Sequence, residues 1–352
     1  PSWLNLPVLE NESELSSMDA VVIGVPWEGG CTIGGYSSCT EGPKAIRSVS
    51  IRYTGYLPDF DLDAFDYLKV GDFGDVACRN GDYPLTFAAI RERISQIEDA
   101  DALPITFGGD HGIAYPIISE IAKRHPKRVG VLHIDAHLDN YSTFGDDEYS
   151  RCSPFYQLYN DPNMDSTKIV HIGIRGPRNH KEEFANAKKY GATVILAREI
   201  KENGWKESIR KAIEIASKDT DLMYITVCSD CLDAASMPQG PQDMCGLTSY
   251  ELCMMLHEAG LAGAKGMDFV EIYPDTLSYQ TAAHDACWAT LLPEWTCREK
   301  EKRGRTEITS ERRSSSANPW SDCCFFIKRI KKSIFLPVCS SRDFVHMKEE
   351  TT

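Results

Sequence analysis

The sequence predicts an α/β protein whose mainly parallel sheet is covered by helices on both faces. Apolar, β-branched runs alternate along the chain with stretches of helical periodicity. The composition, 42% hydrophobic and 26% charged over 352 residues, is that of a globular protein with one large domain or two smaller ones. Acids and histidines follow three of the apolar runs, and the sites of parallel α/β sheets lie at such strand ends.

Seven apolar runs are expected to be strands, and five stretches between them are expected to be helices. Valine, isoleucine and leucine dominate the runs, as is typical of strands buried on both faces. The expected strands are residues 20–25, 103–107, 129–134, 169–174, 192–196, 222–227 and 267–272. The expected helices are residues 43–50, 85–97, 114–124, 205–217 and 249–259.

Charge and composition exclude several function classes. The formal net charge of −14 argues against nucleic acid as a partner. No run of 18 apolar residues occurs, so no membrane span is expected. Residues 1–14 lack a basic region followed by an apolar one, so no signal peptide is expected. The 13 scattered cysteines, an odd number, indicate reduced thiols and a cytoplasmic location.

The chain is expected to divide into a core, residues 1–297, and a C-terminal extension, residues 298–352. The extension holds 13 basic and 8 acidic residues, a net charge of +5, so the core carries −19. Its first part, "REKEKRGRTEITSERRSSSANP", lacks apolar periodicity and is typical of disorder. The stretch "CCFFIKRIKKSIFLPVC" is expected to pack on the core or a partner subunit. An anionic membrane surface is the alternative.

Three expected strands end in carboxylates and imidazoles. The stretches "PITFGGDHG", "VLHIDAHLDN" and "YITVCSDCLD" place there Asp110, His111, Asp135, His137, Asp139, Asp230 and Asp233. A single acid at a strand end is usually a helix N-cap, which is the simpler interpretation of Asp110 and Asp233. Three such ends together favour a site for divalent ions such as Mn²⁺, Zn²⁺, Ni²⁺ or Fe²⁺, because a cation removes the repulsion among crowded carboxylates.

Two further features adjoin these motifs. His133 precedes its strand end, so we expect a buried histidine that supports the site or the core. Cys228 and Cys231 form a Cys-x-x-Cys pair, for which a redox or zinc site is the alternative. No second pair lies at zinc-ribbon spacing, which makes this alternative the weaker one.

The motifs "GGDHG", "DAHLD" and "DCLDAA", in this order and spacing, resemble those of the ureohydrolase superfamily, the arginases, agmatinases and related amidinohydrolases. "EGPKAIR", "HIGIRGPRN" and "FVEIYP" match as well, and the resemblance covers roughly residues 15–293. It is strongest towards the agmatinase and guanidinobutyrase branch. It implies a three-layer α/β/α sandwich, a homo-oligomer of trimer or hexamer type, and a cluster of two divalent metal ions, most often Mn²⁺.

The resemblance also implies a role for each residue at a motif position. His111 and Asp139 would hold one metal ion, His137 and Asp230 would hold the other, and Asp135 would bridge both. Hydroxide formed from a water shared by the two ions would attack the guanidinium carbon. Urea and an amine, or urea and ammonia, would be released.

Four residues are expected to face the substrate. Glu271, in "FVEIYP", matches the carboxylate that pairs with the guanidinium nitrogens, although an ordinary salt bridge at a strand end is the alternative. Asn140, beside "DAHLD", is a second substrate-binding candidate. Trp288 and His284, in "HDACWATL", would narrow the pocket, with helix packing as the alternative.

Two positions depart from the family pattern. Cys228 stands where the family has the first aspartate of Asp-x-Asp, a carboxylate that bridges the metal ions. A thiolate is a softer ligand and shifts the preference from Mn²⁺ towards Zn²⁺, Ni²⁺ or Fe²⁺. Arg151, in "YSRCSPF", stands at the catalytic position of a histidine that shuttles protons, and arginine releases no proton near neutral pH.

These motifs favour a small guanidino substrate. The stretch "GIRGPRNHKEE" lacks the acids that bind the α-amino group in arginases, so arginine is not expected. We expect a hydrolase that releases urea from guanidine, guanidinobutyrate or agmatine with two ions of Mn²⁺, or of Ni²⁺ or another softer metal. The alternative, favoured by Cys228 and Arg151, is a catalytically impaired relative that acts as a binding or regulatory subunit.

Overall fold

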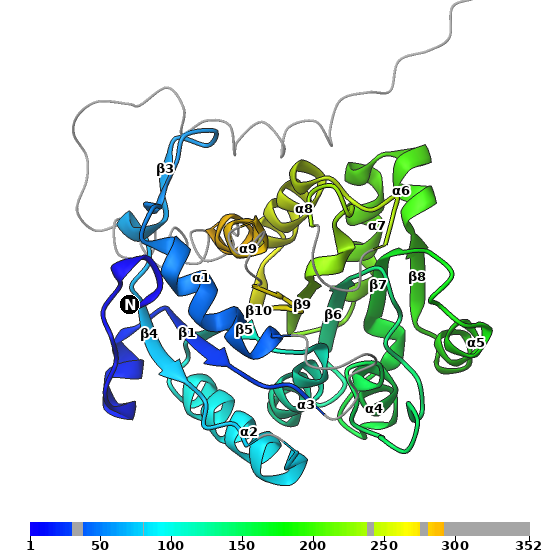
Figure 1. Cartoon of the computed structure of the whole chain (residues 1–352), viewed down its shortest axis with the longest axis horizontal. Helices are drawn as coiled ribbons and strands as arrows, with labels where there is room; N and C mark the ends of the chain where they lie inside the picture. Colours follow the sequence, from blue (N-terminus) through cyan, green and yellow to red (C-terminus); the bar gives the residue numbers. More distant parts are fainter. Residues whose placement is uncertain (30–37, 80, 238–242, 275–280, 292–352) are drawn as a thin grey trace, which may run out of the picture. The chain divides into compact units, whose positions relative to one another are not determined.

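An eight-stranded parallel sheet forms the centre of the computed structural model (Figure 1). The structure describes residues 1–29, 38–79, 81–237, 243–274 and 281–291, so the predicted extension at 298–352 lies outside the described residues. The strand order is β4-β1-β5-β10-β9-β6-β7-β8, and the paired strands run parallel. The strands are β1 (Ala20–Val25), β4 (Val70–Asp75), β5 (Leu103–Gly108), β6 (Val129–Ile134), β7 (Ile169–Ile174), β8 (Thr193–Leu196), β9 (Leu222–Cys228) and β10 (Ala264–Val270).

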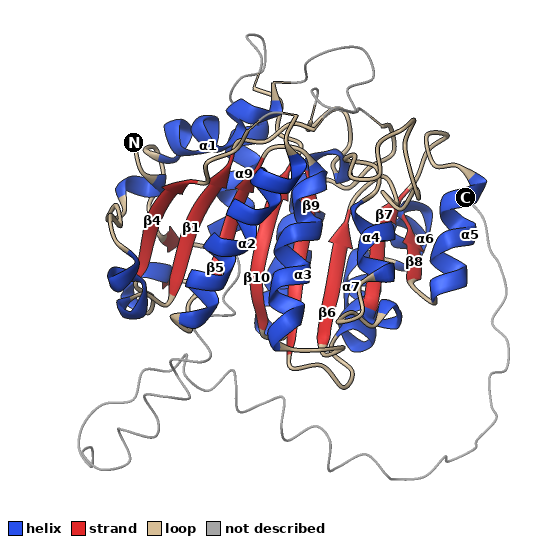
Figure 2. Cartoon of the chain, turned by 90° about the horizontal axis from the view of Figure 1, so that it is seen from below, coloured by secondary structure: helices blue, strands red, loops and turns tan. Residues whose placement is uncertain are grey.

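Helices cover both faces of this sheet, which confirms the predicted three-layer α/β/α fold (Figure 2). One face packs against α1 (Gly42–Ser50), α6 (Ala197–Asn203), α7 (Trp205–Ala216), α8 (Ser249–Leu261) and α9 (Thr281–Leu291). The other face packs against α2 (Tyr83–Asp99), α3 (Ala114–Arg124) and α4 (Pro154–Asn160). Helix α5 (Lys181–Tyr190) lies beside the edge strand β8.

Shorter elements complete the described part of the chain. Strands β2 (Tyr56–Leu57) and β3 (Leu62–Asp63) pair antiparallel apart from the main sheet. The 3₁₀ helices are η1 (Trp3–Asn5), η2 (Glu12–Ser17), η3 (Cys39–Glu41), η4 (Ala64–Asp66), η5 (His111–Ile113), η6 (Ser166–Lys168) and η7 (Ser229–Cys231). No helix within the described ranges combines the length and the apolar character that a bilayer crossing requires.

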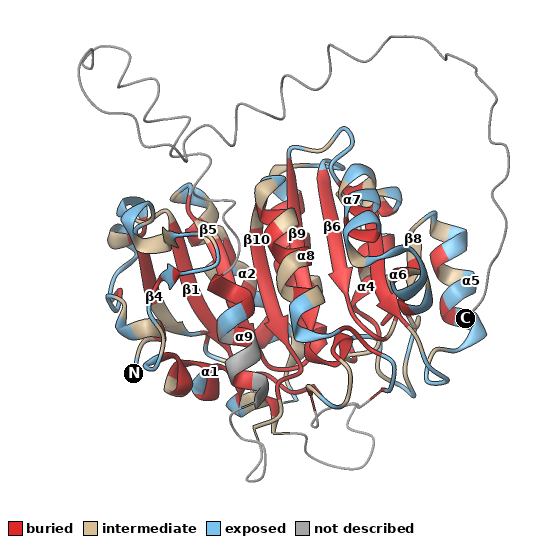
Figure 3. Cartoon of the chain, turned by 90° about the horizontal axis from the view of Figure 1, so that it is seen from above, coloured by how far each residue is buried: buried red, intermediate tan, exposed pale blue. Residues whose placement is uncertain are grey.

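Alternating side chains of β1 show how the sequence builds two hydrophobic cores. Val21 and Ile23 pack with the helices of one face, whereas Ala20 and Val22 pack with those of the other. Successive residues of a strand point to opposite faces, so a run apolar at every position suits a strand covered on both sides. All six residues of β1 are buried, as are most residues of the central strands (Figure 3).

The edge strand β4 was not predicted, because four of the six residues of its sequence, "VGDFGD", are Gly or Asp and no apolar run occurs in it. Its Asp72 is buried and forms a two-bond ion pair with Arg47 of α1, with Nε to Oδ2 and Nη2 to Oδ1 both 2.8 Å. A partner from another element thus stabilises the strand. The helices α4, α5 and α6, which are short, and α9 were also not predicted.

The sequence pattern placed β10 too late, with its start three residues and its end two residues beyond those observed. It begins at Ala264 and ends at Val270, not at Ile272. The reason lies in Glu271, whose φ of 60° is in the left-handed region that ends an extended strand. This bend sets Glu271 beside the loop that follows β5, since its backbone N–H donates to the carbonyl of Gly109 at 2.9 Å.

Candidate metal centre

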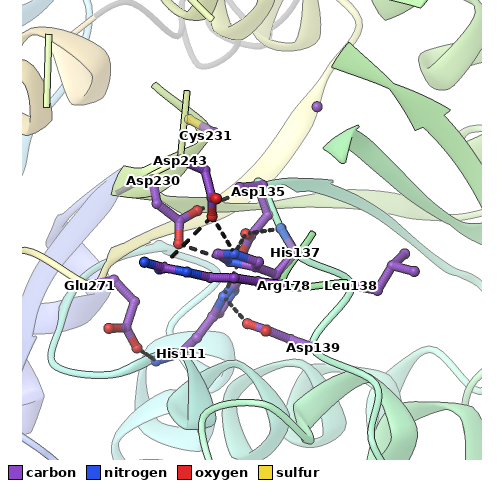
Figure 4. Close-up of polar contacts among 12 residues, drawn as sticks. His111, Asp135, His137, Leu138, Asp139, Arg178, Asp230, Cys231, Asp243 and Glu271 are labelled. Carbon is purple, nitrogen blue, oxygen red and sulfur yellow. Dashed lines mark hydrogen bonds and ion pairs between the residues drawn. The ribbon is translucent and has the colours of Figure 1, made fainter. Parts of the chain in front are cut away.

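The carboxyl ends of β5, β10, β9 and β6 lie side by side in the sheet, and the residues that follow them meet there. Figure 4 shows the side chains of His111, Asp135, His137, Asp139, Asp230 and Asp243 close together. The cluster consists of His111, Asp135, His137, Asp139, Cys228, Asp230 and Asp243. The structure therefore brings together all six residues predicted as metal ligands, and Asp243, which was not predicted, joins them.

His111 follows β5 and is fully buried. The preceding Asp110 is the N-cap of η5, as the simpler interpretation held, because its carboxylate accepts from the N–H of Gly112 at 3.0 Å. Nε2 of His111 lies 3.0 Å from the hydroxyl of Thr226, which itself donates to Asp268. A hydroxyl has one hydrogen, so Thr226 must accept from Nε2–H, and Nδ1 of a neutral ring carries the lone pair.

That lone pair points at negative charge. Nδ1 of His111 lies 3.0 Å from Oδ2 of Asp135 and 3.0 Å from Oδ2 of Asp139, and it makes no hydrogen bond of good geometry to either. Burial opposes a charge on this ring, but the carboxylates of Asp135 and Asp139 outweigh it and raise the pKa of His111 well above its ordinary value in the absence of a metal ion. A divalent cation among the three atoms would take the place of that proton. The buried, unsatisfied Nδ1 thus fits a divalent metal ion.

His137 is oriented in the same way. Its Nε2 lies 2.7 Å from Oδ2 of Asp243, which holds the ring hydrogen on that nitrogen. Its Nδ1 lies 3.1 Å from Oδ2 of Asp230 and 3.6 Å from Oδ1 of Asp135. Both imidazoles therefore turn Nδ1 towards Asp135 and are anchored through Nε2 from behind.

Asp135 is shared by two groups of ligand atoms. One group is His111, His133, Asp135 and Asp139, and the other is Asp135, Cys228 and Asp230, with the ligand atoms of each group within 4.8 Å of one another. Carboxylates and imidazoles with one thiol are a donor set for first-row divalent ions. The described residues fit two ions that share Asp135 as a ligand.

His133 supports Asp135 from behind, as expected. Its Nε2 lies 2.9 Å from Oδ2 of Asp135, and its Nδ1 lies 2.6 Å from Nδ1 of His171. Nε2 of His171 in turn lies 2.6 Å from the hydroxyl of Tyr159. Burial lowers the pKa of His133 to about 4, so the ring is neutral and the chain Tyr159, His171, His133 donates in one direction, towards Asp135.

The cluster holds excess negative charge. Burial and the charge of Asp135 raise the pKa of Asp139 to about 7 and the pKa of Asp230 to about 6. Burial and the neighbouring Asp135 also raise the pKa of the Cys228 thiol well above its ordinary value. Bound cations would reverse all three shifts, which agrees with the geometry of the ligand atoms.

Glu271 and Arg151 are paired beside the cluster. Oε1 of Glu271 accepts from the backbone N–H of His111 at 2.7 Å. Oε2 accepts from Nη1 of Arg151 at 2.9 Å and from the hydroxyl of Tyr273. Nη2 of Arg151 donates to Glu28 at 3.0 Å. Glu28 and Tyr273 were not predicted, because no motif of the sequence connects them with Arg151.

The three remaining substrate-binding candidates take different places. Asn140 is buried, and its Nδ2 donates to the carbonyl of Glu183 at 3.0 Å and to the Tyr159 hydroxyl at 3.3 Å, so it holds α5 in place. Trp288 lies on α9 and is 45% exposed. The side chain of His284, on the same helix, lies outside the described residues. Their roles towards a substrate stay predictions.

Comparisons with known proteins agree with this geometry. The arginase family model matches residues 18–291. The chain is 30% identical to guanidinobutyrase of Pseudomonas aeruginosa over 301 residues, which cover 84% of this chain and 91% of the relative. It is 29% identical to the mitochondrial guanidino acid hydrolase of Homo sapiens, with 84% and 82% covered.

Solved structures share the fold. Proclavaminate amidino hydrolase from Streptomyces clavuligerus superposes with a TM-score of 0.74 at 27% identity, over 84% of this chain and 97% of that one. Trypanosoma cruzi formiminoglutamase, solved with Mn²⁺, has a TM-score of 0.74 at 22% identity, with 84% and 98% covered. The fold and the site define a hydrolase of C–N bonds in amidine groups. The chain belongs to the arginase family, as its motifs predicted.

Proposed function

We propose that the protein is a metal-dependent amidinohydrolase that releases urea from a small guanidino compound, such as guanidine, guanidinobutyrate or agmatine. The observation that carries the proposal is the pair of ligand groups that share Asp135, with two imidazoles whose Nδ1 atoms face the shared carboxylate. The guanidino compounds in the names of the relatives support the substrate class.

Different residues of the chain would bind the metal ions and the substrate in such a reaction. His111, Asp135 and Asp139 would hold one divalent ion, and Asp135, His137, Cys228 and Asp230 would hold the other. When bound, two such ions supply a water of lowered pKa that acts as the nucleophile. Glu271 offers a buried carboxylate next to His111. A guanidinium group, with its parallel N–H donors in one plane, is a suitable partner for such a carboxylate.

Cys228 determines which ions suit the second group of ligands. Mn²⁺ matches the carboxylates and imidazoles, whereas a thiolate in the same group favours Ni²⁺ or another softer ion. We therefore propose Mn²⁺ for the group with Asp139 and either Mn²⁺ or a softer ion for the group with Cys228. We also propose a homo-oligomer, trimer or hexamer, in the cytoplasm. The thiols of Cys78, Cys228 and Cys245 are free, which supports a reducing compartment.

A second function is favoured by the Arg151–Glu271 contact. Glu271, the carboxylate proposed to bind the substrate, already pairs with the guanidinium group of Arg151. A relative that retains the fold and the metal ligands, but not turnover, would serve as a binding or regulatory subunit.

Metal content and urea release separate the two functions. Purified protein would be loaded with Mn²⁺ or Ni²⁺, desalted and measured by elemental analysis, and then assayed with guanidine, guanidinobutyrate and agmatine. Two ions per chain with urea release support the hydrolase, and two ions without urea release support the binding subunit. Fewer than about 0.2 ions per chain after loading would contradict the metal site itself.

A further inference from the structure

Arg151 is a guanidinium bound by the protein's own carboxylates. Its Nη1 donates to Oε2 of Glu271 at 2.9 Å and to the Tyr273 hydroxyl at 2.8 Å. Its Nη2 donates to Oε1 of Glu28 at 3.0 Å and lies 3.9 Å from Oδ2 of Asp110. The described residues thus form a cage that holds a planar cation by its two terminal nitrogens.

The cage is enclosed. The side chain of Arg151 is 14% exposed, and those of Glu28 and Glu271 are 4% and 3% exposed. Nε of Arg151 is buried without a hydrogen-bond partner, so the protein binds the guanidinium group through its terminal nitrogens, Nη1 and Nη2. A free guanidinium ion has the same planar fork on each of its edges, and bidentate carboxylate contacts are its preferred partners.

Hydrogen bonds hold the backbone next to Arg151. The N–H of Cys152 donates to the Ser150 hydroxyl, and the carbonyl of Cys152 accepts from the N–H of Tyr141, each at 3.0 Å. These bonds hold the turn that precedes α4. A rotation of the Arg151 side chain would therefore empty the cage without requiring this turn to move.

We propose that Glu28, Glu271 and Tyr273 form a guanidinium-binding cage and that Arg151 is its built-in occupant, which an external guanidinium must replace before it can pair with Glu271. Two guanidinium groups on one buried carboxylate would bring like charges within a few ångströms of each other. The cage itself does not depend on catalysis. Its consequence, that Arg151 controls which substrates the site accepts, rests on the proposed function.

Binding of guanidinium to the Arg151→Ala variant tests the cage. Metal-free wild type and variant would be melted in chelator with up to 20 mM guanidinium chloride, which is far below denaturing concentrations, and with NaCl at equal ionic strength. The variant is expected to melt at least about 3 °C lower than wild type, because it leaves buried carboxylates without their cation. Guanidinium should restore about half of that loss by binding the folded state, and wild type should not respond.

Three controls make the test specific. Urea has the shape of guanidinium without its charge and should not stabilise the variant. Arg151→Ala with Glu28→Gln should lose most of the guanidinium response. Arg124→Ala removes a partly exposed guanidinium from Asp99, and guanidinium should not rescue it. A wild type stabilised as much as Arg151→Ala, or a variant that responds equally to urea, would overturn the proposal.

Two further measurements cover the remaining outcomes. If Arg151→Ala is insoluble, Arg151→Met retains the apolar stem, and the same guanidinium response is required of it. A crystal structure of the wild type with Arg151 turned away from Glu28 and Glu271 would also overturn the proposal. An Arg151→Ala variant that binds guanidinium, together with a wild type that releases no urea with either metal, would reject the hydrolase function and leave the cage intact.

Discussion

Oδ2 of Asp243 lies 2.7 Å from Nε2 of His137, and this contact determines which nitrogen of the ring faces the cluster. The carboxylate holds the ring hydrogen on Nε2, so Nδ1 presents its lone pair to Asp135 and Asp230. The hydroxyl of Thr226, which donates to Asp268, orients the ring of His111 in the same way, with Nδ1 towards the cluster. Each proposed metal-binding imidazole is thus oriented by a polar group behind it.

Removal of the Asp243 carboxylate behind His137 should weaken metal binding without removing a proposed metal ligand. Asp243→Ala is expected to lower the affinity for the second ion by about 10–100-fold, the usual effect of losing a partner behind a ligating histidine. Titration against a metal-binding dye measures the affinity. Asp221→Ala, which removes a surface carboxylate paired with Arg128, is the matched control and should bind as wild type does. Equal affinities for Asp243→Ala and the control would mean that Asp243 does not orient His137.

The shared position of Asp135 predicts a graded loss of metal. Asp135→Ala should bring the metal content close to zero, because both ligand groups lose an oxygen. Asp139→Ala should retain one ion, since Asp139 belongs to one group only. Elemental analysis after loading and desalting gives the stoichiometry, and far-ultraviolet circular dichroism checks that each variant is folded. The same metal content in both variants would contradict a bridging role for Asp135.

The thiol of Cys228 should set the metal preference. Cys228→Asp replaces a soft ligand by a hard one, so the ratio of Mn²⁺ affinity to Ni²⁺ affinity should rise at least about tenfold. Competition of the two ions for the same protein measures this ratio directly. Cys231→Ala, a change at a buried cysteine outside both ligand groups, should leave the ratio near its wild-type value. No change in the ratio on Cys228→Asp would mean that sulfur does not contact the ions.

Residues 298–352 are proposed to lie outside the folded core. The described helices end with α9, whose Ala283, Ala286 and Ala289 are buried in the hydrophobic core. A chain that ends at Leu292 should therefore melt in one cooperative transition and bind the same number of ions as the full chain. Calorimetry and elemental analysis check both points. A shortened chain that aggregates and loses its cooperative transition would place the extension within the fold.

Local patterns explain why much of the site was predictable. His111, Asp135 and Asp230 each lie within three residues of the end of a buried strand, and the carboxyl ends of parallel strands meet at one edge of the sheet. Asp243 follows no strand end and reaches the site through a loop, whereas Glu28 lies three residues after the end of β1 but belongs to no motif of the pattern. Their positions depend on contacts between segments far apart in the sequence, which residue spacing does not determine.

The same difference separates β1 from β4. Val21, Ile23 and their neighbours are apolar at every position, so β1 was predicted from its own residues. In β4, the buried carboxylate of Asp72 is paired with Arg47 of α1 and accepts from the backbone N–H of Trp3. A buried charge pair between two elements leaves no periodic signal in either one. The bend at Glu271 is another case, because its left-handed backbone is set by the loop after β5.

The two departures from the family pattern should together limit turnover. Arg151 pairs with the carboxylate of Glu271 and releases no proton near neutral pH. The loss of a general acid–base group typically lowers the rate by about 10²–10⁴-fold. Cys228 offers one sulfur where the family has a carboxylate with two oxygens. We therefore expect slow urea release from wild type with Mn²⁺.

The double variant Cys228→Asp with Arg151→His should reverse both effects. It frees Glu271 from its resident guanidinium, places a titratable ring beside it and supplies the missing oxygens. Urea release should rise at least about tenfold, which corresponds to about 1.4 kcal/mol of the activation barrier. The assay uses guanidine, guanidinobutyrate and agmatine, each with Mn²⁺ and with Ni²⁺, and each single variant is the control for the other. A wild type that already turns over at about 1–10³ per second, with a double variant no faster, would show that thiol and guanidinium belong to a working form of the site.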